Sequence, residues 1–218
     1  MRNILLCNLF CISFLTYSIN SLAQITISEG TLCYTIHILK ANKPGVIADS
    51  ATTNIYLKGG QSRTDFLNSL GSESTILDAR TGAAVILKQY SGQKLMITLT
   101  KENFIQKNSK YSGLVFTPTN ESMKIGDFNC KKATTTFSNG TIFTVYYTNE
   151  WNVFNKEYDP MFKNLPGLPV RYQFEKGNLI FQYTLTSVEQ NPIAANKFEI
   201  PKSGYRIMTY EENVDGGQ

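Results

Sequence analysis

The segment Asn164–Val188 reads NLPGLPVRYQFEKGNLIFQYTLTSV: a corner rich in proline and glycine, then two stretches of alternating polar and apolar residues. Pro166 and Pro169 stop a helix from running through the corner, because proline lacks a backbone N–H and clashes with the preceding turn. Gly177-Asn178 predicts the turn of a β-hairpin. The second arm places one apolar set on a single face, which is typical of a half-buried antiparallel strand: Leu179, Phe181, Tyr183 and Leu185.

The same alternation appears near the start of the chain, in EGTLCYTIHIL (residues 29–39). Four apolar side chains share one face there: Leu32, Tyr34, Ile36 and Ile38. The other face carries Thr31, Cys33, Thr35 and His37. This pattern also predicts an antiparallel strand with one face in the core.

Four further hairpins are predicted from turn dipeptides between alternating segments: Gly59-Gly60, Thr81-Gly82, Ser91-Gly92 and Asn139-Gly140. The arms around Asn139-Gly140 are rich in Thr, Phe, Ile, Val and Tyr, which suit a pleated surface. Asn-Gly favours a type I′ turn, in which both central residues have positive φ.

Periodicity is weaker in residues 102–129, where we expect connections and one short strand near Leu114–Phe116. Farther on, Asp159 can cap a short helix that has Pro160 at its first position. Near the C-terminus, Phe198 and Ile200 end one extended piece, and Tyr205 opens another. Residues 213–218 are predicted to be a disordered tail. The sequence thus predicts one mainly β domain over residues 24–212, built on a strongly bent antiparallel sheet or a barrel.

Residues 1–23 have the features of a secretory signal peptide. Arg2 gives a positive start, residues 4–15 are nearly all apolar, and Ser21-Leu22-Ala23 is a small-x-small cleavage pattern. The apolar run is shorter than the ~20 residues of a membrane span. We therefore expect an exported protein, periplasmic or extracellular, with no transmembrane segment after cleavage.

Composition agrees with a globular domain and narrows the partners. Hydrophobic residues make up 42% of the chain and charged residues 17%, which argues against disorder. The net charge of +4 is spread along the chain, and Lys131-Lys132 is its only adjacent basic pair. A nucleic-acid surface needs a dense basic stripe, so we expect no nucleic-acid partner.

Cleavage would leave two cysteines, Cys33 and Cys130. In an oxidising compartment they can form a disulfide, whose loop of about 100 residues would stabilise the fold by roughly 4.7 kcal/mol in the chain-entropy model. The alternative is two separate, unreactive thiols.

Candidate catalytic residues are few. His37 is the one histidine, in mid-strand on the face opposite the apolar one. Ser91 opens SGQK, an S-x-x-K pattern, but it lies in a predicted hairpin turn instead of opening a helix as in serine acylases. One histidine and two distant cysteines do not provide the usual zinc spacing, and no phosphate-binding glycine loop follows a strand. We expect no enzyme activity, no metal and no cofactor.

The notable positive feature is the number of aromatic residues on the predicted strands. They can form an ordinary core. They can also line the concave face of a curved sheet that holds an apolar ligand. For such a cavity we predict the lining residues Leu32, Tyr34, Ile36, Phe137, Tyr146, Phe174, Phe181 and Tyr183.

Leu165-Pro166-Gly167-Leu168 resembles the signature of an uncharacterised exported family of Gram-negative bacteria known as GLPGLI. Asn164 replaces the first glycine of that signature, and Pro169 replaces its isoleucine. The segments EGTLCYTI (29–36) and FEIPKSGYRIMTYEE (198–212) also resemble parts of related secreted proteins. The relatives look like the half-barrel lipoprotein carriers LolA and LolB, in which short helices cross the open side of a bent antiparallel sheet and acyl chains occupy the apolar cavity.

The resemblance implies a periplasmic, non-enzymatic binding protein with a cavity for an apolar ligand or a lipid acyl chain, and it brings no catalytic residues. We expect a lid at Asp159–Leu165, placed by the turn residues Pro166, Gly167 and Leu168, with Pro160 at its start. The alternative is a structural or protein-interaction module of the cell envelope with a self-filled core. A third hypothesis is a hydrolase that uses Ser91 or His37.

Overall fold

The computed structural model describes residues 24–43 and 45–215. Within them, twelve strands form one sheet in the order β14-β7-β6-β5-β4-β3-β2-β13-β12-β10-β9-β8. The central strands are β2 (Glu29–Lys40), β3 (Ile47–Lys58), β4 (Gln61–Asn68), β5 (Gly71–Asp78), β6 (Ala84–Tyr90) and β7 (Gln93–Leu99). The others are β8 (Thr117–Ile125), β9 (Phe128–Thr136), β10 (Ile142–Thr148), β12 (Leu168–Lys176), β13 (Leu179–Glu189) and β14 (Arg206–Thr209).

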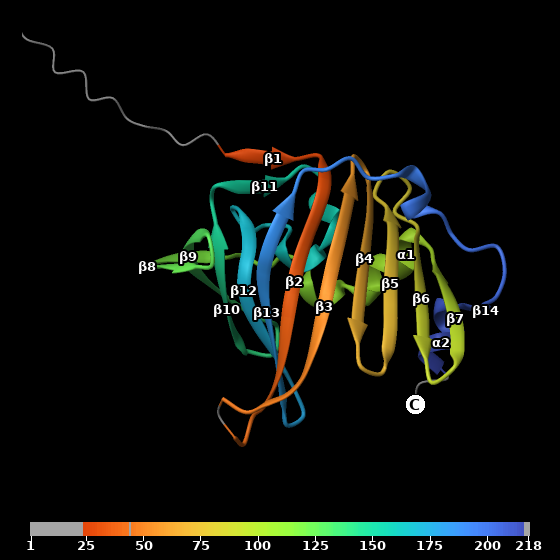
Figure 1. The fold of residues 1–218 in the computed structure, drawn as a ribbon, viewed down its shortest axis with the longest axis horizontal. Coiled ribbons are helices and arrows are strands. Elements are labelled where there is room, and N and C mark those ends of the chain that lie inside the picture. Colours follow the sequence, from red (N-terminus) through yellow and green to blue (C-terminus); the bar gives the residue numbers. More distant parts are fainter. Residues whose placement is uncertain (1–23, 44, 216–218) are drawn as a thin grey trace, which may run out of the picture.

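The sheet is strongly bent and open. Figure 1 shows β8, β9 and β10 turning behind the plane of β2–β7 on one side, while β14 ends the sheet on the other. The described residues contain no pairing between β14 and β8 that would close a barrel. The predicted mainly β fold with a bent, open sheet is therefore confirmed.

Two pairings are parallel and were not predicted. β14 runs parallel to β7, with Arg206 opposite Leu95. A separate two-stranded sheet joins β1 (Ile25–Ile27) in parallel to β11 (Trp151–Val153). The β14–β7 pair makes the large sheet mixed, because all its other ladders are antiparallel.

Short helices cover the inner, concave face. They are α1 (Lys101–Lys107), η1 (Ser109–Tyr111), η2 (Lys156–Tyr158) and η3 (Pro160–Phe162), and α1 lies behind the strands in the view of Figure 1. The main core lies between this face and its cover. It includes Leu32, Tyr34 and Val145 from the sheet, with Phe162 and Leu165 from the cover.

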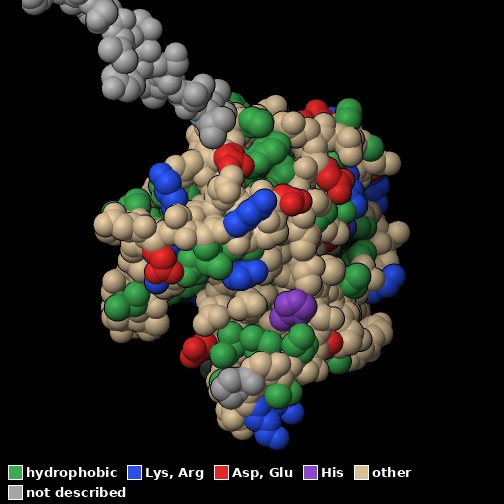
Figure 2. All heavy atoms as spheres, turned by 60° about the vertical axis from the view of Figure 1, so that its left-hand side comes forward, with side chains coloured by type: hydrophobic (Ala, Val, Ile, Leu, Met, Phe, Trp, Pro, Cys, Tyr) green, Lys and Arg blue, Asp and Glu red, His purple; other side chains and the backbone are tan. Residues whose placement is uncertain are grey.

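The C-terminal segment crosses the outer face of the sheet, in front of the strands in Figure 1. Its 3-10 turn η4 (Ala195–Phe198) packs Phe198 against Ile76 and Met96. The ammonium group of Lys58 donates to Glu29 at 2.7 Å and to the Ile193 carbonyl at 2.6 Å, which fastens the segment to the sheet. Elsewhere on the outer side, acidic and basic side chains are interspersed in the face that Figure 2 shows.

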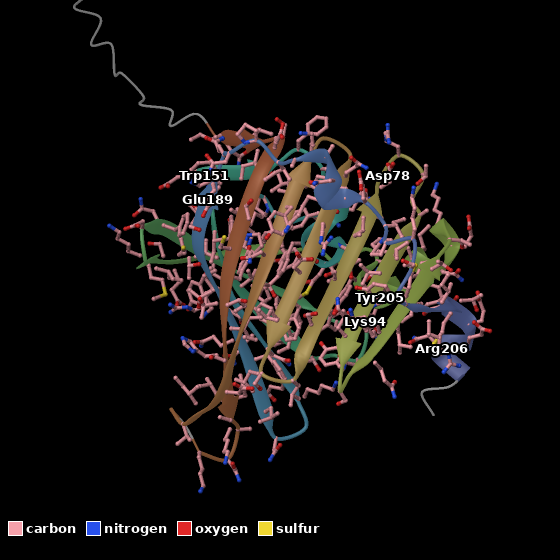
Figure 3. The ribbon with its side chains drawn as sticks, turned by 45° about the vertical axis from the view of Figure 1, so that its right-hand side comes forward. Asp78, Lys94, Trp151, Glu189, Tyr205 and Arg206 are labelled. Carbon is pink, nitrogen blue, oxygen red and sulfur yellow. The ribbon has the colours of Figure 1, made fainter. Side chains whose placement is uncertain are left out.

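At the far edge, Figure 3 shows Lys94, Tyr205 and Arg206 beside β7 and β14. The Gln89 side chain donates to the Tyr205 hydroxyl at 2.7 Å and helps to hold this edge. The chain then enters α2 (Tyr210–Asp215), so residues 213–215 of the predicted disordered tail are helical. Residues 216–218 and the predicted signal peptide, 1–23, lie outside the described residues.

Several local predictions require correction. The connection after β7 contains α1, whose N-terminus has a capping box between Thr100 and Asn103. The predicted short strand at Leu114–Phe116 is irregular, and the strand β8 begins after it. Phe198 lies in η4 and not in an extended piece.

The type I′ turn was also assigned to the wrong hairpin. Asn139 does not have positive φ, whereas Ser91 (φ 51°) and Gly92 (φ 78°) both do. Positive φ at two adjacent central residues is what a type I′ turn requires.

Candidate functional site

The inner face of the sheet and its cover form a half-open pocket of about 350 Å³, called the cavity below. β3, β4, β5, β6, β12 and β13 line it from the sheet, and α1, η1, η2 and η3 line it from the cover. Ligand pockets in proteins span roughly 300–1,000 Å³, so this volume is at the small end of that range. Eight of the lining side chains are aromatic: Phe66, Phe104, Tyr111, Tyr158, Phe162, Tyr172, Phe174 and Tyr183.

The β12–β13 hairpin supplies one wall of the cavity. Tyr172 pairs with Tyr183 and Phe174 pairs with Phe181 across the ladder. Phe174 contacts the rings of both Tyr172 and Tyr183 edge to face, with centroids 5.7 and 6.0 Å away. Alternation along β12 puts Tyr172 and Phe174 on the same face, which gives the cavity a continuous aromatic wall.

The lid segment Asp159–Leu165 forms another wall. Asp159 caps η3 by accepting a hydrogen bond from the Met161 N–H at 3.1 Å, and Pro160 occupies the first turn. This confirms the predicted cap, although the helix is a single 3-10 turn. Phe162 points toward the sheet, with its ring centroid 4.8 Å from that of Tyr172.

Helix α1 completes the cover. The Thr100 hydroxyl accepts from the Asn103 N–H, and the Asn103 side chain accepts from the Thr100 N–H, which fixes the start of the helix. Such a capping box stabilises a helix N-terminus by satisfying donors that have no partner in the helix. Phe104 on α1 and Tyr111 on η1 then reach the cavity.

Asp159 is the unusual charged group of the site. The residue lines the cavity, and burial raises the pKa of its carboxyl group to about 6, although the N–H groups of Met161 and Phe162 act against the shift. In the described residues, no Lys or Arg side chain forms an ion pair with it. Burial likewise raises the pKa of Tyr183 to about 12, so this phenol stays neutral at physiological pH.

A second, larger hollow of about 800 Å³ adjoins the first. It lies where β10 and β12 diverge, since their pairing begins at Val145 opposite Tyr172 and does not include Ile142–Thr144. Both hollows share the lining residues Tyr111, Tyr172 and Phe174. These three aromatic residues therefore stand between the two hollows, and the second is called the groove below.

Of the eight predicted lining residues, four line at least one of the two hollows and four line neither. Phe174 and Tyr183 line the cavity, whereas Phe137, Tyr146 and Phe174 line the groove. Leu32, Tyr34, Ile36 and Phe181 lie on the inner face as predicted, but they pack within core clusters and line neither hollow.

Tyr34 and Tyr146 were wrongly assigned to the cavity for different reasons: parity was insufficient at Tyr34, and the prediction went against parity at Tyr146. The Tyr34 hydroxyl donates to the Pro169 carbonyl at 2.8 Å inside the core. On β10, simple alternation turns Phe143, Val145 and Tyr147 into the core, so Tyr146 lies on the opposite face, where its hydroxyl donates to Glu121 at 2.8 Å.

The corner residues after the lid are structural. Leu165 and Leu168 are fully buried, at 0% and 1% exposure. A Cβ atom on Gly167 would lie 2.2 Å from the Thr148 carbonyl oxygen, so only glycine fits there. Pro166 lies between these packed positions and keeps the corner out of helix.

Cys33 and Cys130 are free thiols. Cys130 belongs to the inner core together with Leu32 and Tyr34, so Cys33, between these two on β2, points to the opposite face. Their strands are also four spacings apart, about 19 Å along the sheet, while a disulfide joins Cα atoms within about 7 Å. Of the two alternatives, the structure has the separate thiols.

Sequence reasoning missed several cavity residues. Tyr172 has the same strand parity as Phe174, so the signal for it was present in RYQFEK. Phe66 and Thr75 come from β4 and β5, where the alternation is less apolar. Phe104 and Tyr111 required α1 to be recognised.

The residues of the hydrolase hypothesis are not brought together. His37 lies in β2 and Ser91 in the β6–β7 turn, four strand spacings or about 19 Å apart along the sheet. The histidine, purple in Figure 2, lies at the outer face, and no described residue bonds its Nδ1.

The described part of the chain offers neither a metal site nor a membrane-spanning helix. Residues 24–43 and 45–215 contain no group of three His, Cys, Asp or Glu side chains that could hold a metal ion. No helix in these residues is long and apolar enough to span a bilayer.

Comparison with known protein families gives no match, and no curated protein matches the chain. Among solved structures, PNGF-II is 15% identical over 83% of this chain and 31% of its own chain, with a TM-score of 0.47. This chain thus spans about a third of the length of PNGF-II.

Two other solved structures are similar at the same level. The Pseudomonas aeruginosa MucA/MucB complex gives 11% identity over 80% of this chain and 56% of that chain, with a TM-score of 0.43. LprF from Mycobacterium bovis gives 10% identity over 76% and 88%, with a TM-score of 0.37. These TM-scores are too low to support a conclusion about function, and we draw none from them.

Proposed function

We propose that the protein is an exported, non-enzymatic binding protein that holds an apolar ligand or a lipid acyl chain between the concave face and its lid. The observation that supports this most directly is the aromatic cavity of about 350 Å³, which shares Tyr111, Tyr172 and Phe174 with the groove between β10 and β12. Burial of an acyl chain there would contribute about 0.8 kcal/mol per methylene. The resemblance of Leu165–Leu168 to the GLPGLI signature, and through it to LolA and LolB, supports the same class.

A structural or protein-interaction module of the cell envelope is the second candidate. One observation favours it: much of the inner face is already filled by the protein's own side chains, with Leu32, Ile36 and Leu185 at 0–2% exposure. In that case the cavity would be a packing defect beside a complete core.

Binding of a neutral apolar dye separates the two candidates. We would titrate the mature protein with N-phenyl-1-naphthylamine and compare two variants. Thr75→Phe places a ring in the cavity, whereas Thr52→Phe places the same ring on an exposed outer-face position of β3.

The binding protein should take up the dye, Thr75→Phe should bind it about tenfold more weakly because the ring occupies its space, and Thr52→Phe should bind it normally. A folded protein that takes up no dye would favour the interaction module. Equal binding by the wild type and Thr75→Phe would place the dye outside this cavity and contradict the proposed site.

A further inference from the structure

The charge of the cavity is more specific than its apolar lining. Asp159 contributes a carboxylate from the lid, and the rings of Tyr158, Phe162, Tyr172 and Tyr183 line the same space. Tyr158, Tyr172 and Tyr183 line the same pocket as Asp159; burial raises their pKa values most, and the charge of Asp159 raises them further. An acidic residue and several aromatic residues therefore line the same pocket.

The protein does not neutralise this carboxylate. Lys107 is the one basic residue of the cavity lining, and it is exposed at the surface of α1 without an ion pair to Asp159. The nearby Lys163 pairs with Glu157 instead. Asp159 is half-buried and its carboxylate accepts the Met161 N–H but forms no ion pair, so a cation on the ligand would supply the missing opposite charge.

Aromatic rings favour the same kind of ligand. The faces of Tyr and Phe rings attract ammonium groups, and the attraction increases when water is excluded. A fatty acid would instead bring a second carboxylate beside Asp159, which like-charge repulsion disfavours.

We propose that the ligand carries an ammonium group, which lies against the Asp159 carboxylate among the aromatic rings while the apolar part fills the rest of the cavity and the groove. This inference rests on the proposed function and adds to it the chemical class of the head group: a cationic or zwitterionic amphiphile, in preference to a fatty acid.

A purely structural role for Asp159 can be separated from ligand recognition. Asp159 also caps η3 through the Met161 N–H. Asn caps helices about as well as Asp, so Asp159→Asn removes the charge and keeps the cap. Glu157→Gln is the matched control, because it removes one carboxylate two residues before Asp159, from a residue that pairs with Lys163 and does not line the cavity.

The experiment uses two probes of equal chain length, dodecyltrimethylammonium and dodecanol, below micelle-forming concentrations at pH 7.5. Each displaces N-phenyl-1-naphthylamine from the mature wild type, Asp159→Asn or Glu157→Gln. We expect the wild type and Glu157→Gln to bind the ammonium probe about tenfold more tightly than the alcohol. Asp159→Asn should bind both probes equally, with its affinity for the alcohol unchanged.

Each result has one consequence. Equal binding of both probes by the wild type would overturn the head-group inference and leave the apolar site intact. A preference that persists in Asp159→Asn would also overturn it, because the charge would then act from elsewhere. Failure of the wild type to bind the dye or either probe would overturn the proposed function itself, and the inference with it.

Discussion

The rings of Tyr172 and Tyr183 stack face to face, with centroids 4.8 Å apart and planes inclined by 9°. The two residues oppose each other directly in the β12–β13 ladder, so the stack is a cross-strand pair. Tyr172 also contacts Phe162 of the lid. This one pair therefore forms a wall of the cavity and supports the lid above it.

The contact between lid and sheet should contribute strongly to stability. Phe162 is 4% exposed and packs against Phe116, Phe143 and Tyr172, so Phe162→Ala should lower the free energy of unfolding by about 3–5 kcal/mol. Urea denaturation measures this. Phe154 is the control, because it is 69% exposed and its replacement by Ala should change stability by less than about 0.5 kcal/mol. Similar losses for both variants would mean that the lid is not packed as described.

The corner after the lid should accept no side chain at Gly167. A Cβ atom there would meet backbone atoms of Thr148, which cannot move aside, so Gly167→Ala should destabilise by about 1–3 kcal/mol. At Gly60 the added methyl would meet only the flexible Arg80 side chain at 3.2 Å, and Gly60→Ala should be far milder. The difference in urea midpoint between the two variants is the readout, and equal midpoints would contradict the close approach.

Asp159 should make stability depend on pH in the direction opposite to an ordinary salt-bridged carboxylate. Its pKa is about 6 in the folded protein, above the ordinary aspartate value of 3.8, so the folded state binds a proton more tightly than the unfolded state. Stability from this group is then lost as pH rises through 6 and recovered between pH 6 and 4, by about 2 kcal/mol. Thermal denaturation of the wild type and Asp159→Asn at pH 5 and 7.5 measures the difference.

The other titratable groups around Asp159 do not obscure its effect on stability between pH 5 and 7.5. The tyrosines that face it, Tyr34, Tyr158, Tyr172 and Tyr183, have raised pKa values and stay neutral throughout. Glu73 and Lys107 also line the cavity and are present in both proteins, so they cancel in the comparison. If the wild type and Asp159→Asn change in parallel between pH 5 and 7.5, the carboxylate is not buried as described.

The two thiols should differ in reactivity. Burial raises the pKa of the Cys130 thiol to about 11, whereas Cys33 is half-buried on the outer face. The thiolate is the reactive species, so a thiol reagent at pH 8 should label Cys33 in the native protein and both cysteines only after unfolding. Labelling that appears only after reduction would indicate a disulfide and contradict the structure.

The hairpins could be predicted from the sequence because their signals are local. Gly59-Gly60, Thr81-Gly82 and Gly177-Asn178 each lie between alternating segments, and each joins paired strands. The parallel pairs β1–β11 and β14–β7 join segments more than a hundred residues apart, and no local sequence pattern predicts such pairings.

The candidate site was only partly predictable for a related reason. Asp159 and Pro160 carry a local capping signal, so the lid turn could be placed. Tyr34 and Tyr183 share the inner face, yet one is sealed in the core and the other is open to the cavity. That distinction depends on where α1 and η3 sit over the sheet, which alternation along a strand does not encode.

Native mass spectrometry of the mature protein tests the central claim most directly. The protein would be purified from an envelope fraction without detergent, and then exchanged against added lipid. The proposed function predicts extra mass that matches an amphiphile and that a competing lipid displaces. A single mass at the cleaved polypeptide value, with no uptake of added lipid by a folded protein, would contradict a ligand-binding cavity and favour the self-filled interaction module.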